Sequence, residues 1–414
     1  MASRHARAVA PSAVAPSSAA ARERRTLAAA ASAHILHDGY TDLLYVLLPV
    51  WQAEFGLGFA EVGLLRASYT GIMAALQIPA SMLAERCGPV VVLVGGTILS
   101  GTCFLFAGAS LGLASLLAAL ALGGLGASAQ HPIASSLVSA VFHGSRSRAA
   151  LGVYNFSGDL GKMLMPVLAA LLLGAMPWRQ ALWVLGGLGI ACAALVLALA
   201  PAGANAPLRP DKDAADRAGA AQPASAGPPR RGFLLLLAIA MIDSAGRSGF
   251  LTFLPFLFKA KEASIASIGG ALSLLFVGGA AGKLVCGYLG ARIGLLNTVL
   301  LTEGLTAIGI IALLPLPLAG SLAVMPLLGI GLNGTSSALY GTVPELVAPA
   351  RRARAFGIFY TGAIAASAAM PALIGLIGDS FGVTTAMTII AVTVLATVPL
   401  SALLMPMLPA PARG

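Results

Sequence analysis

The sequence predicts an all-α integral membrane protein, with twelve transmembrane helices in two pseudo-symmetric six-helix bundles. The first observation behind this prediction is composition. Of the 414 residues, 58% are hydrophobic and 10% are charged, whereas about a quarter of the residues are charged in a typical soluble chain. Such a chain has too little polar surface to cover a water-soluble core, so the bilayer must be its solvent. The alternating pattern of membrane β-strands is missing from the sequence, which favours helices.

The second observation is an internal repeat at an offset of 205 to 206 residues. Pro49 recurs as Pro255, and Met165-Pro166 recurs as Met370-Pro371. A duplication of apolar segments on this scale is typical of two related membrane bundles with an axis and a cavity between them. The repeat therefore favours a secondary transporter.

The elements follow in order from the apolar segments, since a helix needs about 20 apolar residues to cross the hydrocarbon core. Six candidates lie on each side of a polar gap. The candidate spans are 28–52, 60–84, 89–109, 112–142, 149–174, 178–200, 233–258, 265–289, 295–315, 318–345, 353–378 and 382–408. The fourth and the tenth are longer than a simple span requires, so we expect them to tilt or to project into the cytoplasm.

The polar segments predict the domain organisation. We expect a disordered cytoplasmic tail, an N-terminal bundle, a flexible cytoplasmic linker, a C-terminal bundle and a short cytoplasmic tail, at 1–27, 28–200, 201–232, 233–408 and 409–414. With both termini cytoplasmic, only Arg179, Lys259 and Lys261 among the loop cations face outside, as the positive-inside rule requires. The net charge of +10 thus reflects topology in a bacterial inner membrane, and we expect no nucleic-acid partner.

A short repeated segment connects the second span to the third and the eighth to the ninth. Ser81-Met82-Leu83-Ala84-Glu85-Arg86-Cys87-Gly88 and Gly287-Tyr288-Leu289-Gly290-Ala291-Arg292-Ile293-Gly294 both resemble the loop signature G-x-L-x-D-R-x-G of the major facilitator superfamily. Each copy departs from it, with Ser81 for Gly, Glu85 for Asp and Ala291 for Asp. The resemblance implies two bundles that work by alternating access, and a cytoplasmic gating role for Glu85, Arg86, Gly88, Arg292 and Gly294.

Two further segments narrow the resemblance. The stretches 32–38 (Ser-Ala-His-Ile-Leu-His-Asp) and 124–132 (Gly-Leu-Gly-Ala-Ser-Ala-Gln-His-Pro) look like corresponding elements of the fosmidomycin-resistance exporters within this superfamily. Exporters of the superfamily also carry a Gly-Pro element late in the fifth span. The stretch 158–166 resembles it in part, with Met165 where the pattern has Gly, and this puts the direction of export in doubt.

Ionisable residues inside the spans are candidate functional groups, because an intramembrane charge is costly unless it is paired or hydrated. His34, Asp38 and Asp42 follow at four-residue steps and share one helical face. Such a stripe, with His131 of the fourth span, could carry a proton, since histidine titrates near neutral pH. The alternatives are that His34 merely orients Asp38, and that His131 is a packed hydrogen-bonding residue.

Other polar residues are candidates for a substrate cavity: Arg66, Gln130, Asn155, Asp159, Lys162, Asp243 and Arg247. The plain alternative is that Asp159 pairs with Lys162 and Asp243 with Arg247, which would only make insertion tolerable. The basic residues favour an organic anion, with a neutral or cationic drug as the alternative. Lys283 and Glu303 lie nearer the expected cytoplasmic ends, where snorkelling is the simpler explanation.

Together these patterns predict a secondary transporter and not an enzyme. We expect proton-coupled export of a small anionic or amphiphilic compound, with proton-coupled uptake of an organic acid as the alternative. A non-transporting sensor or scaffold ranks last, because a scaffold gains nothing from intramembrane charges. No metal-binding motif is present, so we expect no metal and no cofactor besides the proton gradient. The expected partners are the small-molecule substrate and the lipid bilayer, and the expected state is a monomer.

Overall fold

The computed structural model describes residues 16–143, 145–205, 231–347 and 352–408. Within these ranges the chain is helical and contains no strand. The N-terminal half consists of α1 (Pro16–Phe55), α2 (Phe59–Cys87), α3 (Pro89–Gly108), α4 (Leu113–Ala127), α5 (Gln130–Val141), α6 (Ser145–Ala175) and α7 (Trp178–Leu199). The C-terminal half consists of α9 (Arg231–Ala260), α10 (Ile265–Leu313), α11 (Leu318–Leu346), α12 (Arg352–Leu395) and α13 (Thr397–Leu404).

These helices confirm the expected all-α membrane fold class. The fourth expected span is divided into α4 and α5, while α10 holds the eighth and ninth expected spans and bends at Gly294. Similarly, α12 bends at Gly382 between the eleventh and twelfth. Among the described residues, nine segments are long and apolar enough to cross a membrane; the count of twelve stays a prediction.

The segments expected to be irregular are partly ordered. Helix α1 begins at Pro16, inside the expected disordered tail. Within this segment Arg25 donates hydrogen bonds to the carbonyls of Ala198 and Leu199 at the end of α7. In the expected linker, Asn205 accepts a hydrogen bond from the Val91 backbone N–H with its Oδ1, at 3.0 Å. Residues 1–15, most of the linker (206–230) and the expected tail at 409–414 lie outside the described residues.

The two copies of the repeated loop share one backbone conformation. Gly88 has a φ of +93° and Gly294 a φ of +79°, in the region that favours glycine because a Cβ would clash. Each glycine lets one helix stop and the next begin without a long loop. The gating role expected for these loops is untested, although Arg292 lies 4.4 Å over the Tyr288 ring.

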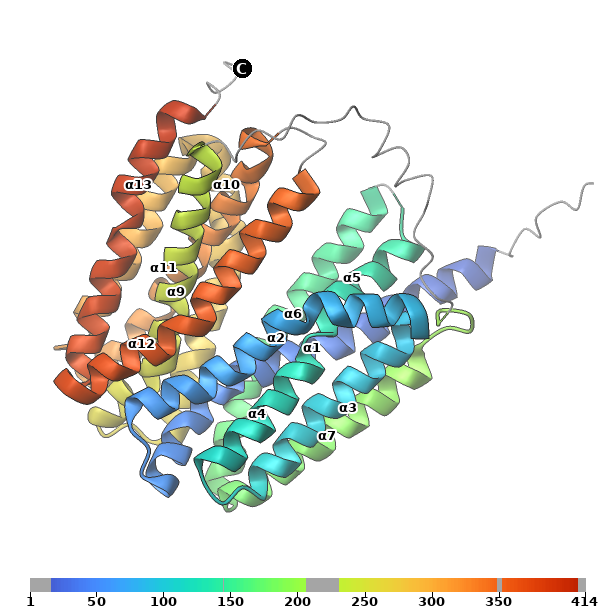
Figure 1. Cartoon of the computed structure of the whole chain (residues 1–414), viewed down its shortest axis with the longest axis horizontal. Helices are drawn as coiled ribbons and strands as arrows, with labels where there is room; N and C mark the ends of the chain where they lie inside the picture. The colour runs from blue at the N-terminus through green and yellow to red at the C-terminus, as the bar shows by residue number, and fades with distance from the viewer. Residues whose placement is uncertain (1–15, 144, 206–230, 348–351, 409–414) are drawn as a thin grey trace, which may run out of the picture.

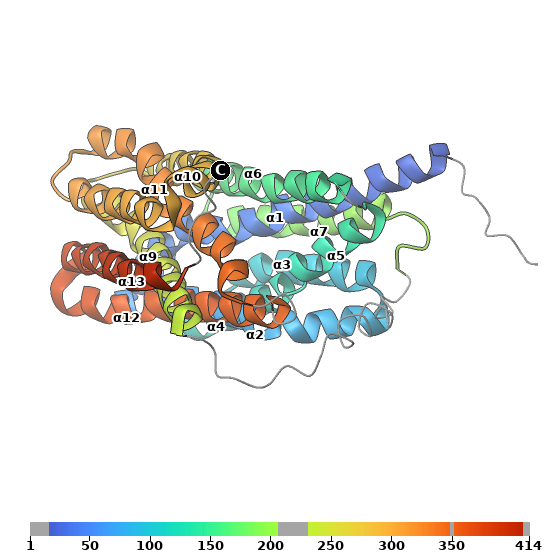
Figure 2. The same ribbon diagram turned by 90° about the horizontal axis from the view of Figure 1, so that it is seen from above.

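The two halves form two bundles that meet along two seams. Figure 1 shows α1–α7 on one side and α9–α13 on the other, with α2 crossing beside α12. Figure 2 shows the second seam, where α6 runs beside α10. The seams are related by the repeat. A side chain on Gly63 would overlap the Pro371 backbone, and one on Gly269 would overlap the Pro166 carbonyl, and each pair is the other shifted by 205 to 206 residues.

An acidic residue ties the bundles together at one end. The Asp379 carboxylate accepts hydrogen bonds from the backbone N–H groups of Phe59 (2.6 Å) and Ala60 (3.0 Å). These are the first N–H groups of α2, which lack partners inside their own helix, and the positive end of the helix dipole favours a carboxylate. We call this the sealed end, and toward it the ribbons of the two bundles converge (Figure 1).

Candidate functional site

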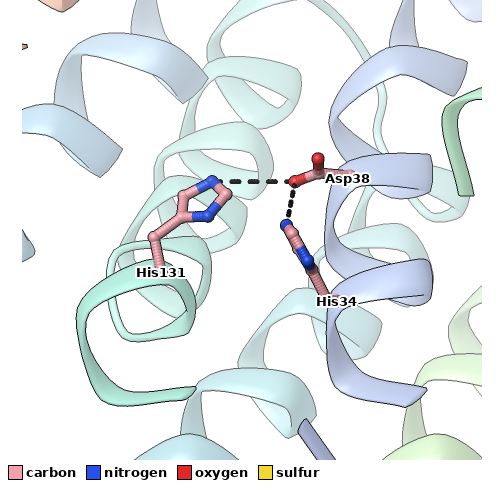
Figure 3. Close-up of side chains that lie close together, drawn as sticks. All are labelled: His34, Asp38 and His131. Atoms are coloured by element: carbon pink, nitrogen blue, oxygen red, sulfur yellow. Dashed lines mark ion pairs between the residues drawn. The ribbon is translucent and has the colours of Figure 1, made fainter. Parts of the chain in front are cut away.

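The centre of the candidate site is the carboxylate of Asp38 on α1, whose side chain is 10% exposed. Three histidine Nε2 atoms surround its Oδ1 atom: His34 at 3.4 Å, His131 at 3.6 Å and His37 at 3.9 Å. Figure 3 shows His34 and Asp38 projecting from α1 toward His131 on α5. The expected grouping of His34, Asp38 and His131 is therefore present in the structure.

A break in the expected fourth span brings His131 to this position. Helix α4 ends at Ala127 and α5 begins at Gln130, because Pro132 has no N–H to donate to a preceding carbonyl. The His131 side chain is 44% exposed, whereas that of His34 is 4% exposed. His131 therefore bridges the buried carboxylate and the accessible side of the cluster.

The contacts of His34 determine where its proton lies. Its Nδ1 atom is 2.8 Å from the backbone carbonyl oxygen of Tyr154. A carbonyl oxygen only accepts hydrogen bonds, so Nδ1 carries the hydrogen, and the ring is stacked on Tyr154 at 4.1 Å. A neutral ring would then point the Nε2 lone pair at the Asp38 carboxylate. Two acceptors in contact repel each other, so the pair is favourable when a proton lies on His34 or on Asp38.

Two lysines complete the electrostatics of the site. Lys162 Nζ on α6 lies 3.3 Å from Asp38 Oδ2, and Lys283 Nζ on α10 lies 2.5 Å from Asp159 Oδ1. The suggested local pair of Asp159 with Lys162 is therefore wrong. Lys162 pairs with Asp38 on α1, and Asp159 pairs with Lys283 on α10. The snorkelling explanation for Lys283 is also wrong, because its ammonium reaches across from the other bundle.

The backbone of α6 forms one wall of the site. Gly158 lies so close to α1 that an added Cβ would be 2.6 Å from both Asp38 Oδ2 and the His34 ring. A larger residue would push the carboxylate off its histidines. The glycine therefore sets the distance between α1 and α6 where Lys162 reaches Asp38.

The ligand atoms of His34, Asp38 and His131 lie within 4.8 Å of one another, which is close enough to approach one metal ion. The fourth neighbour argues against this use. The Lys162 ammonium occupies the other oxygen of Asp38, and a fixed positive charge there repels a divalent cation. The donor set fits a proton and an anion better than a metal.

Several expected site residues form no ion pair with the Asp38 cluster. Asp42 is buried, and no described side chain forms an ion pair with it. Arg66 is also buried, and its guanidinium donates to the Thr41 carbonyl (3.0 Å) and to the Tyr45 hydroxyl (2.9 Å). Its charge is thus committed to the N-terminal bundle. Asn155 lies on an exposed face of α6.

Three further candidates have neighbours that the sequence did not indicate: Gln130, Asp243 and Arg247. Gln130 lines a small pocket together with His37 and Thr97. Arg247 donates to the Ser244 hydroxyl at 3.4 Å, and no ion pair joins it to Asp243 within the described residues. Asp243 instead lies against Glu303 of α10.

The sequence analysis missed His37 and Lys283 as site residues. His37 directly precedes Asp38 and lies off the four-residue stripe, but its ring centroid is 5.0 Å from that of His131. The signal for His37 was its place in the segment 32–38. For Lys283 the only signal was an intramembrane charge, because its partner Asp159 belongs to the other half of the chain.

Two bundles related by a repeat thus meet at a cluster of charged side chains. The family model of the Major Facilitator Superfamily matches residues 30–242 and 236–414. The chain belongs to this superfamily. Membership of this superfamily establishes a multi-pass membrane transporter of small molecules, which is not an enzyme.

The chain is similar to several named transport and resistance proteins. It is 30% identical to the fosmidomycin resistance protein of Escherichia coli K12 over 39% of its own length and 41% of that protein. It is 26% identical to a probable 4-methylmuconolactone transporter of Cupriavidus pinatubonensis over 88% of its length and 86% of that protein. The fold is similar to a bacterial homologue of the human lysosomal transporter Spinster, with a TM-score of 0.78 and 16% identity over 97% of this chain and all of that one.

Proposed function

We propose that this chain is a proton-coupled transporter of small organic anions in the bacterial inner membrane, with Asp38 as the coupling carboxylate. The observation that carries the proposal is the contact of His34 Nε2 with Asp38 Oδ1 at 3.4 Å. The Tyr154 carbonyl fixes the His34 tautomer, so a proton on His34 Nε2 or on Asp38 would make this contact favourable. The half-exposed ring of His131 offers a path between this proton and water.

Lys162 supplies the coupling between proton and substrate. While Asp38 is ionised, the Lys162 ammonium is neutralised by it at 3.3 Å. When a proton neutralises Asp38, the ammonium loses its partner and becomes available to a carboxylate or phosphonate. Proton binding therefore strengthens anion binding, and by linkage anion binding strengthens proton binding to the same degree.

Two directions of transport have separate support. Export of an anionic or amphiphilic compound is favoured by the similarity to a resistance protein, which covers two fifths of the chain. Uptake of an organic acid is favoured by Lys162 and Asp38, because ligands that strengthen each other's binding travel together, and protons flow inward down the usual gradient. The relative that is 26% identical over 88% of the chain is named as a probable 4-methylmuconolactone transporter.

The test uses purified protein in liposomes that contain a pH-sensitive dye, under an imposed proton gradient, with a panel of carboxylates, phosphonates and cationic drugs. Proton flux in the same direction as an added anion would establish co-transport and uptake, and opposite flux would establish export by exchange. In Asp38→Asn the proton flux should fall to that of empty liposomes, while Glu262→Gln, an exposed loop variant, should behave as the parent protein. Full proton flux in Asp38→Asn would refute the assignment.

A further inference from the structure

Three aromatic side chains of the C-terminal bundle form a cluster near the end of α11 and the beginning of α12. The ring of Tyr340 on α11 packs against that of Phe356 at 4.7 Å and that of Tyr360 at 5.1 Å, measured between ring centroids. Tyr340 is 39% exposed and Tyr360 is 48% exposed. We call these three residues the aromatic cluster. Its two tyrosines present ring surface outside the core of their own bundle.

The face of α12 that holds Tyr360 is directed toward the N-terminal bundle. Eleven residues further along α12, Pro371 packs so closely on α2 that a side chain on Gly63 would overlap its backbone. Residues eleven apart in a helix point in the same direction to within about 20°. Figure 1 shows the beginning of α12 on the side of its bundle nearest the N-terminal half. Tyr360 therefore faces the space between the bundles, whereas the tyrosines of an interfacial belt face lipid.

The repeat supports this direction independently. Asn155 of α6 becomes Tyr360 when it is shifted by 205 residues, just as Pro166 becomes Pro371. Asp159 lies one turn from Asn155 on the same face of α6, and its carboxylate pairs with Lys283 of the other bundle. The equivalent face of α6 is thus also directed across the gap between the bundles.

The aromatic cluster lies close to the depth of the Asp38 carboxylate. A Cβ on Gly158 of α6 would be 2.6 Å from Asp38 Oδ2, and the repeat equivalent of Gly158 on α12 is Ala363. Two halves related by an axis along the membrane normal place equivalent residues at equal depth, on opposite sides of that axis. Tyr360 precedes Ala363 by three residues, which is about 4.5 Å of helix rise.

The two facing surfaces differ in chemistry. Asp159 of α6 corresponds to Ile364 of α12, and Lys162 corresponds to Ser367. The N-terminal surface is therefore charged, while the C-terminal surface has an aliphatic residue and a small hydroxyl beside the exposed tyrosine rings. Aromatic rings in contact are stabilised beyond the burial of their area by edge-to-face or offset stacking. An anion with a flat ring fits both surfaces at once.

We propose that the aromatic cluster binds the ring of a transported anion whose carboxylate or phosphonate is held by Lys162. The inference rests on the proposed function, because it takes Lys162 as the anion-binding cation. It narrows the substrate class to organic anions that contain an aromatic or similarly flat unsaturated ring. The two bundles then recognise two parts of one molecule, so the ligand is complete only when both surfaces contact it.

Calorimetric titration of the full-length protein in detergent tests the subsite, with phenylacetate and cyclohexylacetate as probes. The two anions have equal charge and equal numbers of carbon atoms, and differ in the flatness of the ring. Tyr360→Leu should weaken the binding of phenylacetate relative to cyclohexylacetate by about threefold to tenfold, the value of one pair of aromatic rings. Tyr340→Leu should act in the same direction.

Two variants serve as controls. Tyr360→Phe retains the ring and should retain the parent ratio of the two dissociation constants. Phe106→Leu removes an exposed ring of α3, which is outside the cluster, and should also bind as the parent does. An unchanged ratio in both Tyr340→Leu and Tyr360→Leu would overturn the proposal, as would a parent protein that binds neither anion.

A second measurement needs no substitution, so it holds even where the leucine variants do not fold. In parent protein that is deuterated except for its tyrosine rings, nuclear magnetic saturation should pass from tyrosine to the ring protons of phenylacetate. Absence of this transfer would contradict the subsite. Both measurements detect binding and not proton flux. Full proton flux in Asp38→Asn would thus refute the coupling alone, whereas an unchanged affinity ratio with normal proton flux would refute the aromatic subsite alone.

Discussion

At the scale of single residues, Lys162 provides the positive charge next to the Asp38 carboxylate. Its ammonium lies 3.3 Å from one carboxylate oxygen while the histidines surround the other. If Lys162 binds the anion after Asp38 is protonated, Lys162→Gln should weaken substrate binding by about 2 kcal/mol, the value of a hydrogen bond to a charged group, or about thirtyfold. Initial transport rates over a range of anion concentrations measure this as a rise in KM. Lys259→Gln, at an exposed position, is the control, and an unchanged KM in Lys162→Gln would contradict the role.

Arg66 has a structural role that the sequence did not reveal. Its guanidinium lies 4.5 Å from the Tyr45 ring centroid and donates to the Tyr45 hydroxyl inside the N-terminal bundle. Arg66→Met should leave the Tyr45 hydroxyl and the Thr41 carbonyl without their donor, at a cost of about 1–3 kcal/mol for each buried group left unpaired. Thermal unfolding in detergent should show a lower Tm. A normal Tm together with lost substrate binding would support the cavity role expected from the sequence.

At the scale of elements, the turn between the two halves of α10 depends on one glycine. Gly294 has a φ of +79°, which costs other residues about 1–2 kcal/mol. Gly294→Ala should therefore destabilise the protein by about that amount, as measured by thermal unfolding. Gly304→Ala is the matched control, because Gly304 is in the same helix with no neighbouring atom within 4 Å of an added Cβ. Equal Tm values for the two variants would show that the turn can relax.

At the scale of the whole molecule, the two seams should act alike because the repeat relates them. Gly63 packs against Pro371 as Gly269 packs against Pro166. Gly63→Leu and Gly269→Leu should each separate the bundles at the sealed end, and spin labels on the exposed Ala53 and Ser380 should move apart in both. Gly174→Leu, where the added side chain meets open space, should leave the distance unchanged. A response in one seam variant alone would contradict the symmetry.

The sequence predicts those parts of the fold and of the candidate site that depend on the repeat and on the helical period. They placed Asp38 and His34 on one face and His131 on a bent helix, because these depend on spacing and on Pro132. They could not give the rotation of one helix against another. That rotation decides whether Lys162 meets Asp159 or Asp38, and whether Glu303 points to the lipid headgroups or to Asp243. The pair of Lys283 with Asp159 also needed the docking of the two bundles, which neither half specifies alone.

The contact of Asp379 with the start of α2 bears on how the protein responds to the salt concentration of its medium. Both partners are at the surface of the sealed end, which faces outward in the topology expected from the basic residues. Dissolved ions screen such exposed attractions over about 8 Å at physiological ionic strength. At 2.6 and 3.0 Å the two contacts are much shorter than this distance, so they should hold in dilute and in saline media alike.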